Sequence, residues 1–113
     1  MAYLRDKHQR GLQSKTVAIG IDPLKALTTG IDNIALGTNS MDALTTGICN
    51  VAIGTNALGA STTGCYNIAI GVGPMQGGAT TGIDNIALGT TAMEALTSGI
   101  CNIAIGTNAL GAS

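Results

Sequence analysis

The chain has 113 residues, of which 45% are hydrophobic but only 2% are aromatic. A core built from Ala, Ile, Leu, Val and Met alone is thin and layered, because globular cores of this size use aromatic rings to fill their volume. The three cysteines are an odd number and show no Cys-x-x-Cys spacing, so the sequence indicates neither a disulfide framework nor a zinc site.

Charge is divided between a basic start and an acidic remainder. Residues 1–15 hold four basic residues and one acid (+4 − 1 = +3), and residues 16–113 hold one lysine and five acids (+1 − 5 = −4). The start lacks the apolar segment of a signal peptide, and no run reaches the roughly 18–20 apolar residues of a membrane span. We therefore expect a basic N-terminal arm at residues 1–15, a repeat domain at residues 16–113, and synthesis on the cytosolic side.

The arm mixes apolar and basic side chains, a composition that suits a contact with another protein. Its only histidine is expected to be solvated, not to act as a base or a metal ligand. Four basic charges without an organised patch predict at most weak, nonspecific binding of nucleic acid. Two interpretations stay open: a disordered tail, or an anchor on an acidic surface. The candidate contact residues of the anchor are Tyr3, Leu4, Arg5, Lys7, His8 and Arg10.

Six copies of an apolar–Ala–apolar–Gly unit follow along the chain. The units recur every 17 residues, except for one step of 18 in which Gly77 and Gly78 add a residue. Alternating side chains predict a short strand in each unit, and the glycine predicts a tight corner. The period therefore predicts an all-β solenoid of six rungs with a 17-residue repeat. The units lie at residues 17–20, 34–37, 51–54, 68–71, 86–89 and 103–106.

A longer duplication is superimposed on this period. Residues 30–61 and 82–113 differ at five of 32 positions, with an offset of 52 residues, which is 17 + 17 + 18. This offset indicates that three rungs were copied as one block.

The repeat predicts which ladders fill the coil. We expect the Ile, Leu and Val side chains of the units to point inward, together with a ladder of Leu24, Met41, Leu58, Met75, Met93 and Leu110. The alanines would then form a smooth apolar strip outside, and such strips mark interfaces. The expected trimer interface consists of Ala18, Ala35, Ala52, Ala69, Ala87 and Ala104. Three solenoids side by side and an interlocked triple β-helix both remain open as windings of this β-prism.

Two further positions are expected to be structural. Cys65 occupies a position that is isoleucine in the other rungs, so we expect it to be a small core residue. One asparagine precedes each of the last five units, and its amide is expected to satisfy backbone groups at the corner. This structural ladder consists of Asn33, Asn50, Asn67, Asn85 and Asn102.

The unit Thr-Thr-Gly-Ile-Asp-Asn-Ile-Ala-Leu-Gly-Thr-Asn at residues 28–39 resembles the repeats of trimeric phage fibres and of trimeric autotransporter adhesin heads. The resemblance covers residues 16–113 and implies a homotrimeric β-roll or β-helix that serves as a stalk or head. A coiled-coil stalk, a membrane anchor and a receptor tip are not recognisable here. The short arm and compact prism therefore suggest a phage capsid decoration, or cement, protein. It would reside in the virion, be assembled in the host cytoplasm, and be anchored on the major capsid protein.

Catalytic chemistry finds little support in the sequence. Asp32 and Asp84 share their repeat position with Cys49, Tyr66 and Cys101, so that position tolerates unrelated side chains. We therefore expect no enzymatic activity, cofactor, metal, small-molecule substrate or membrane partner.

Two other functions stay open. One is a phage tail-fibre or adhesin-type module that binds a host surface, although saccharide contact commonly uses aromatic rings and the repeat domain has only Tyr66. The other is an ice-binding solenoid, which is disfavoured because adjacent threonines such as Thr28 and Thr29 point to opposite faces.

Overall fold

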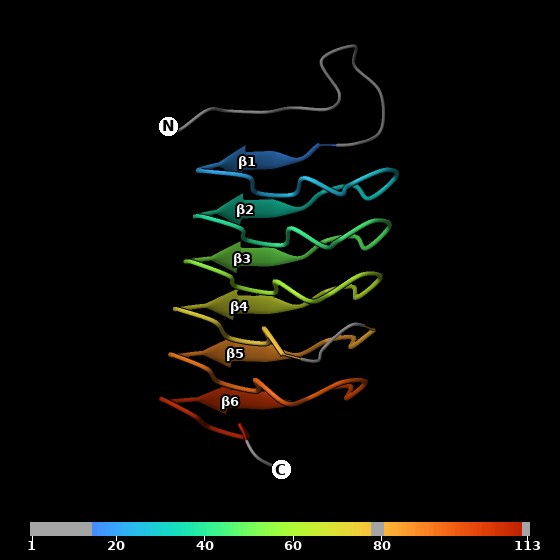
Figure 1. The fold of residues 1–113 in the computed structure, drawn as a ribbon. Coiled ribbons are helices and arrows are strands. Elements are labelled where there is room, and N and C mark those ends of the chain that lie inside the picture. Colours follow the sequence, from blue (N-terminus) through green and yellow to red (C-terminus); the bar gives the residue numbers. More distant parts are fainter. Residues whose placement is uncertain (1–14, 78–80, 112–113) are drawn as a thin grey trace.

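The structure, a computed structural model, describes residues 15–77 and 81–111 (Figure 1). Six strands of three residues each form a single parallel sheet in chain order, which confirms the predicted all-β solenoid with one strand per rung. The arm residues Tyr3, Leu4, Arg5, Lys7, His8 and Arg10 lie outside the described residues. The strands are β1 (Val17–Ile19), β2 (Ile34–Leu36), β3 (Val51–Ile53), β4 (Ile68–Ile70), β5 (Ile86–Leu88) and β6 (Ile103–Ile105).

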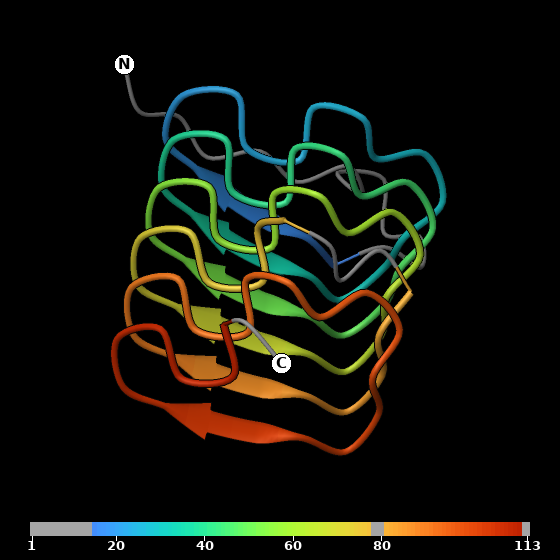
Figure 2. The same cartoon turned by 60° about the horizontal axis from the view of Figure 1, so that its bottom comes forward.

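Equivalent residues of successive repeats lie next to one another throughout the sheet. Ala18 pairs with Ala35, and the same register continues to Ala87 and Ala104. Even across the 18-residue step, Ala69 pairs with Ala87, so the added residue is absorbed between β4 and β5 without a register shift. Seen from the side of β6, the turns stack as loops around a common interior, with the strands along one wall (Figure 2).

The strand alanines point into this interior, and the prediction that they form an outer strip was wrong. Each strand is buried at its central alanine and more open at the two flanking residues. The Ile, Leu and Val side chains of the strands therefore point outward, opposite to the expectation. The alanines, 0–4% exposed, are Ala18, Ala35, Ala52, Ala69, Ala87 and Ala104.

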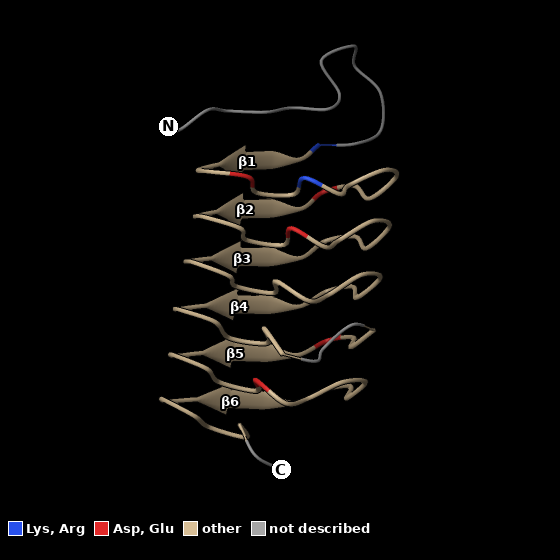
Figure 3. Ribbon diagram, in the orientation of Figure 1, with Lys and Arg blue, Asp and Glu red and all other residues tan. Residues whose placement is uncertain are grey.

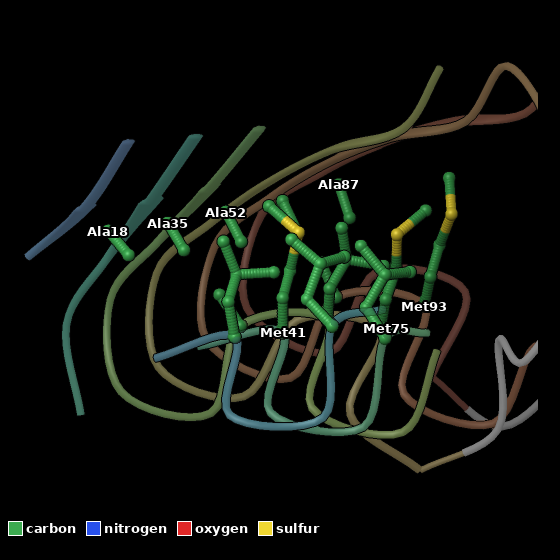
Figure 4. Close-up of a cluster of buried hydrophobic side chains, with 14 of the residues drawn as sticks. Ala18, Ala35, Met41, Ala52, Met75, Ala87 and Met93 are labelled. Atoms are coloured by element: carbon green, nitrogen blue, oxygen red, sulfur yellow. The ribbon is translucent and has the colours of Figure 1, made fainter. Parts of the chain in front are cut away.

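Alanine fits on the inner side of the sheet because large side chains from the wall opposite the sheet already fill the interior. The predicted Leu/Met ladder is buried from Leu24 to Met93, and only Leu110 in the last rung is exposed. These side chains and the alanines form one apolar cluster (Figure 4). Since the large side chains come from the wall facing the sheet, only a methyl group fits on the sheet side, and the branched aliphatic residues are directed outward.

This packing predicts a strong response to a larger side chain at Ala52, which is fully buried in the middle of the sheet. We expect Ala52→Leu to lower the free energy of unfolding by about 3 kcal/mol, because overpacking a close-packed core forces side chains and backbone to shift. Urea titration followed by circular dichroism measures the loss. Ile53→Leu, a volume-conserving change on the outward side of the same strand, is the control and should have little effect. Equal stability of the Ala52→Leu variant and the parent would contradict an inward orientation of the alanines.

The asparagine ladder is confirmed and binds the rungs to one another. The Asn50 Nδ2 donates to Asn33 Oδ1 at 3.1 Å and to the Gly64 carbonyl at 2.7 Å, while the Asn50 N–H donates to the same Asn33 Oδ1 at 3.0 Å. The same three bonds repeat at Asn67 and at Asn85. Each amide therefore connects its own rung to both neighbours, which satisfies polar groups that are buried beside the apolar core.

Candidate interaction surface

The outward side of the sheet carries only branched aliphatic side chains, two from each strand. We refer to them together as the aliphatic face. No lysine, arginine, aspartate or glutamate lies on any strand, and the charged residues of the described chain lie outside β1–β6 (Figure 3). The aliphatic face consists of Val17, Ile19, Ile34, Leu36, Val51, Ile53, Ile68, Ile70, Ile86, Leu88, Ile103 and Ile105.

The side chains of this face are partly exposed to solvent. Ile34 and Ile70 are 40% and 38% exposed, although each has a neighbouring strand on both sides. The exposed fraction rises to 66% and 69% at Ile103 and Ile105, in the last strand. At Val17 and Ile19 in the first strand it is 37%, so the outward side chains keep part of their surface open to solvent along the described sheet.

The face is one continuous apolar strip. With strands about 4.8 Å apart and about 3.4 Å per residue, it is a strip about 24 Å long and about 10 Å wide. Ile21 and Val72, each two residues beyond a strand, add further exposed apolar surface to the molecule. The largest exposed apolar patch of a typical monomer measures about 300–600 Å² and is often functional.

A second column precedes the strands by three residues and is half-buried to exposed. It consists of Ile31, Ile48, Cys65, Ile83 and Ile100, of which Ile83 and Ile100 are 40% and 63% exposed. Isolated parallel bridges join Cys65 to Ile83 and Ile83 to Ile100. Cys65 is thus half-buried in an outward column, its thiol 3.4 Å from the Thr63 carbonyl, and the prediction that it is a core residue was wrong.

Each residue of this column is followed directly by a residue whose type varies between rungs. These variable residues share one backbone conformation. All five have φ between 57° and 60°, in the left-handed region that non-glycine residues adopt uncommonly, although their side chains are chemically unrelated. The position therefore retains a backbone conformation and not a functional group. Its residues are Asp32, Cys49, Tyr66, Asp84 and Cys101.

In residues 15–77 and 81–111, no group of three or more His, Cys, Asp or Glu side chains is placed to hold a metal ion. An ion pair joins Lys25 Nζ to Asp42 Oδ2 at 3.7 Å between neighbouring rungs, and both side chains reach solvent. Such an exposed pair contributes about 0–1 kcal/mol to stability.

Sequence reasoning found the strands of the aliphatic face but assigned them the wrong orientation. A usable signal was the asparagine ladder, because Asn33 and Ala35 are two residues apart and so point to the same side of the strand. An asparagine that satisfies corner backbone groups lies inside the coil, so the alanine must lie there too. Hydrophobicity alone favoured the opposite orientation, since isoleucine is more apolar than alanine.

Comparison with known proteins returns no match to a protein-family model, a curated protein or a solved structure. In the described part of the chain, no helix has the length and apolar character needed to cross a membrane.

Proposed function

We propose that this chain is a structural protein that assembles as a homotrimer through its aliphatic face. The observation that carries the proposal is the uncharged strip of twelve aliphatic side chains on the outside of an otherwise well-packed coil. Burial of apolar surface contributes about 25 cal/mol per Å², so association of such strips is favourable without any polar recognition.

A closed ring is the assembly that fits this surface best. Three copies with their aliphatic faces turned toward a common axis bury all three strips at once and form a triangular prism, whereas a two-fold pair would bury them face to face. Closed cyclic symmetry also avoids the open-ended growth that a heterologous contact can produce. The aliphatic face thus replaces the alanine ladder as the proposed trimer interface. The resemblance of the repeats to trimeric fibres and adhesin heads favours three copies over two.

Within this role, we propose that the trimer decorates a phage capsid. The arm, net +3, would anchor the trimer on an acidic patch of the major capsid protein, and the acidic repeat domain, net −4, would face outward. The support is the charge division between the arm and the repeat domain. The protein would then be a virion component without a cofactor or a substrate.

The assembly step is tested by the mass of the purified protein in light scattering. We expect about three times 11.2 kDa for the full chain. The double variant Ile34→Lys/Ile70→Lys should have the mass of a monomer with an unchanged circular dichroism spectrum, because both side chains are already 38–40% exposed in the single chain. A double variant with the same added charge at exposed turn positions, Thr46→Lys/Thr63→Lys, is the control and should remain trimeric. A trimeric Ile34→Lys/Ile70→Lys variant would contradict the role of the aliphatic face.

The capsid step is tested separately by removal of residues 1–15. The truncated protein should keep its trimeric mass and lose co-sedimentation with phage heads. Retained binding by the truncated trimer would exclude the arm as the anchor. A monomeric parent protein would instead favour a lone solenoid that binds a host surface or ice.

A further inference from the structure

Two columns of residues border the aliphatic face, one before and one after the strands. The start column lies two residues before each strand and consists of Lys15, Asp32, Cys49, Tyr66, Asp84 and Cys101. The end column lies two residues after each strand and consists of Ile21, Thr38, Thr55, Val72, Thr90 and Thr107. The two columns therefore mark the two edges of the wall that carries the aliphatic face.

Backbone hydrogen bonds between rungs hold both columns in register with the sheet. On the start side, the Tyr66 N–H donates to the Ile48 carbonyl at 3.0 Å. On the end side, the Thr91 N–H donates to the Val72 carbonyl at 3.0 Å. Equivalent bonds of 2.9–3.2 Å recur from rung to rung at both columns. Each residue of a column therefore lies level with the strand that it flanks, and Tyr66 and Val72 both lie level with β4.

The chemistry of the two columns changes at the same rung. Val72 is the one residue of the end column after Ile21 that is not threonine, and Tyr66 is the one aromatic residue of the start column. Their side chains are 56% and 50% exposed. Beside β2 and β5, the start column has aspartate, a hydrogen-bond acceptor, and the end column has threonine, a donor. Each of these three rungs thus has side chains of matching character at its two edges.

This match has no explanation within a single chain. Tyr66 and Val72 are six residues apart on an extended segment, which separates them by about 20 Å at about 3.4 Å per residue. A closed ring brings such edges together, because each of its contacts joins two different surfaces of the same chain. Rotation about an axis parallel to the stack of rungs also keeps equivalent rungs at one height. The start column of one copy then meets the end column of the next copy, rung by rung.

The width of the wall fits a ring that closes at these two columns. Three walls about 20 Å wide leave about 6 Å between each wall and the axis, and a packed sheet contributes a side-chain layer of about 5 Å, half the spacing of stacked sheets. Walls that met at the strand ends, only about 10 Å wide, would leave about 3 Å, too little for isoleucine. The ring therefore has room for the aliphatic face when the corners lie at the start and end columns.

We propose that Tyr66 of one copy packs against Val72 of the next copy at each corner of the trimer. The inference rests on the proposed homotrimer and adds which edges meet and at what height. A shift of one rung would place Val72 against Asp84 and Tyr66 against Thr55, so it would press a carboxylate against an apolar side chain. The aligned ring avoids this mismatch. At β1 the equivalent pair is Lys15 and Ile21, and the aliphatic stem of a lysine can cover apolar surface.

Disulfide crosslinking tests this pair in a chain whose native cysteines are replaced by Cys49→Ser, Cys65→Ser and Cys101→Ser. In this serine variant, Tyr66→Cys/Val72→Cys should give a covalent trimer on denaturing gels after oxidation with copper phenanthroline, and a reductant should reverse it. The Cα atoms can approach within the roughly 7 Å that a disulfide needs only between copies. Tyr66→Cys/Thr107→Cys is the matched control. Its two thiols differ in height by two rungs, about 9.6 Å, so it should stay a single chain on the gel.

Light scattering separates a failure of this inference from a failure of the proposed function. If the serine variant has a trimeric mass but its Tyr66→Cys/Val72→Cys form does not crosslink, the inference is overturned and the homotrimer is not. Crosslinking of the Tyr66→Cys/Thr107→Cys control to the same extent would also overturn it. A monomeric parent chain would contradict both the inference and the homotrimer.

Discussion

Replacement of Gly37 by alanine is expected to abolish stable folding of the solenoid. Gly37 follows β2 with φ = +130°, a conformation that L-amino acids rarely adopt, and its added Cβ would lie 2.7 Å from the Gly54 carbonyl oxygen and 2.8 Å from its carbonyl carbon. These atoms belong to the backbone of the next rung, so no side-chain rotation can relieve the contact. We expect a loss of more than about 4 kcal/mol, a large part of the total stability of a domain of this size.

Gly106 supplies the matched control. It follows β6 with φ = +122°, but no atom of residues 15–77 or 81–111 lies within 4 Å of the position that an added Cβ would take. Gly106→Ala should therefore carry only the conformational cost, about 1–3 kcal/mol. Urea unfolding of both variants separates the two contributions. If both variants lost the same free energy of unfolding, close approach between the backbones of adjacent rungs would not be the reason for glycine after each strand.

The second large effect is expected for Asn67→Ala in the centre of the asparagine ladder. This change removes two bonds donated by the Asn67 amide, to Asn50 Oδ1 and the Gly82 carbonyl, and two that its Oδ1 accepts from Asn85. The polar groups left behind are buried, and each unsatisfied group costs about 1–3 kcal/mol. We expect the free energy of unfolding to fall by about 4 kcal/mol, measured by urea titration.

Asn102→Ala tests whether this loss comes from the ladder. Asn102 is only partly buried, and its amide bonds to Asn85 Oδ1 at 3.0 Å and to the carbonyl of Ile100 in its own turn at 3.1 Å. We expect a loss of about 1 kcal/mol, because water can replace the missing partners. If Asn102→Ala lowered the free energy of unfolding as much as Asn67→Ala does, burial of the asparagine between two rungs would not be the cause of the loss.

The repeat period was sufficient to predict the strands, their order and their register. Each apolar–Ala–apolar unit is a strand in the structure, from Val17–Ile19 to Ile103–Ile105, and equivalent residues pair across the 18-residue step. The reason is that in a parallel stack of identical turns the sequence offset between equivalent residues is itself the register. The asparagine ladder was predictable for the same reason, since a polar side chain repeated at a corner can bond only to its own kind and to the adjacent backbone.

The orientation of the strands was not predictable from hydrophobicity, because both sides of each strand are apolar. The orientation follows from the volume available inside the coil next to the sheet. That volume depends on the side chains of the wall opposite the sheet. That wall also uses a backbone conformation without a sequence signal: Met41 and Leu58 have φ of 51° and 54°, although glycine or asparagine is typical of this region. The candidate surface depends on this packing, so hydrophobicity alone could not assign it, whereas the asparagine two residues before each alanine gave a usable signal.

The exclusive pairing of each strand with its immediate sequence neighbours has an evolutionary consequence. A change in the number of rungs leaves every remaining contact intact, provided that whole repeats are gained or lost, and the three-rung duplication with its 52-residue offset is a record of such an event. Each added repeat lengthens the column by about 4.8 Å and extends the aliphatic strip in proportion. Unequal recombination within the gene would therefore change the height of the molecule and the area of its aliphatic face together, in steps of one repeat, without any new fold.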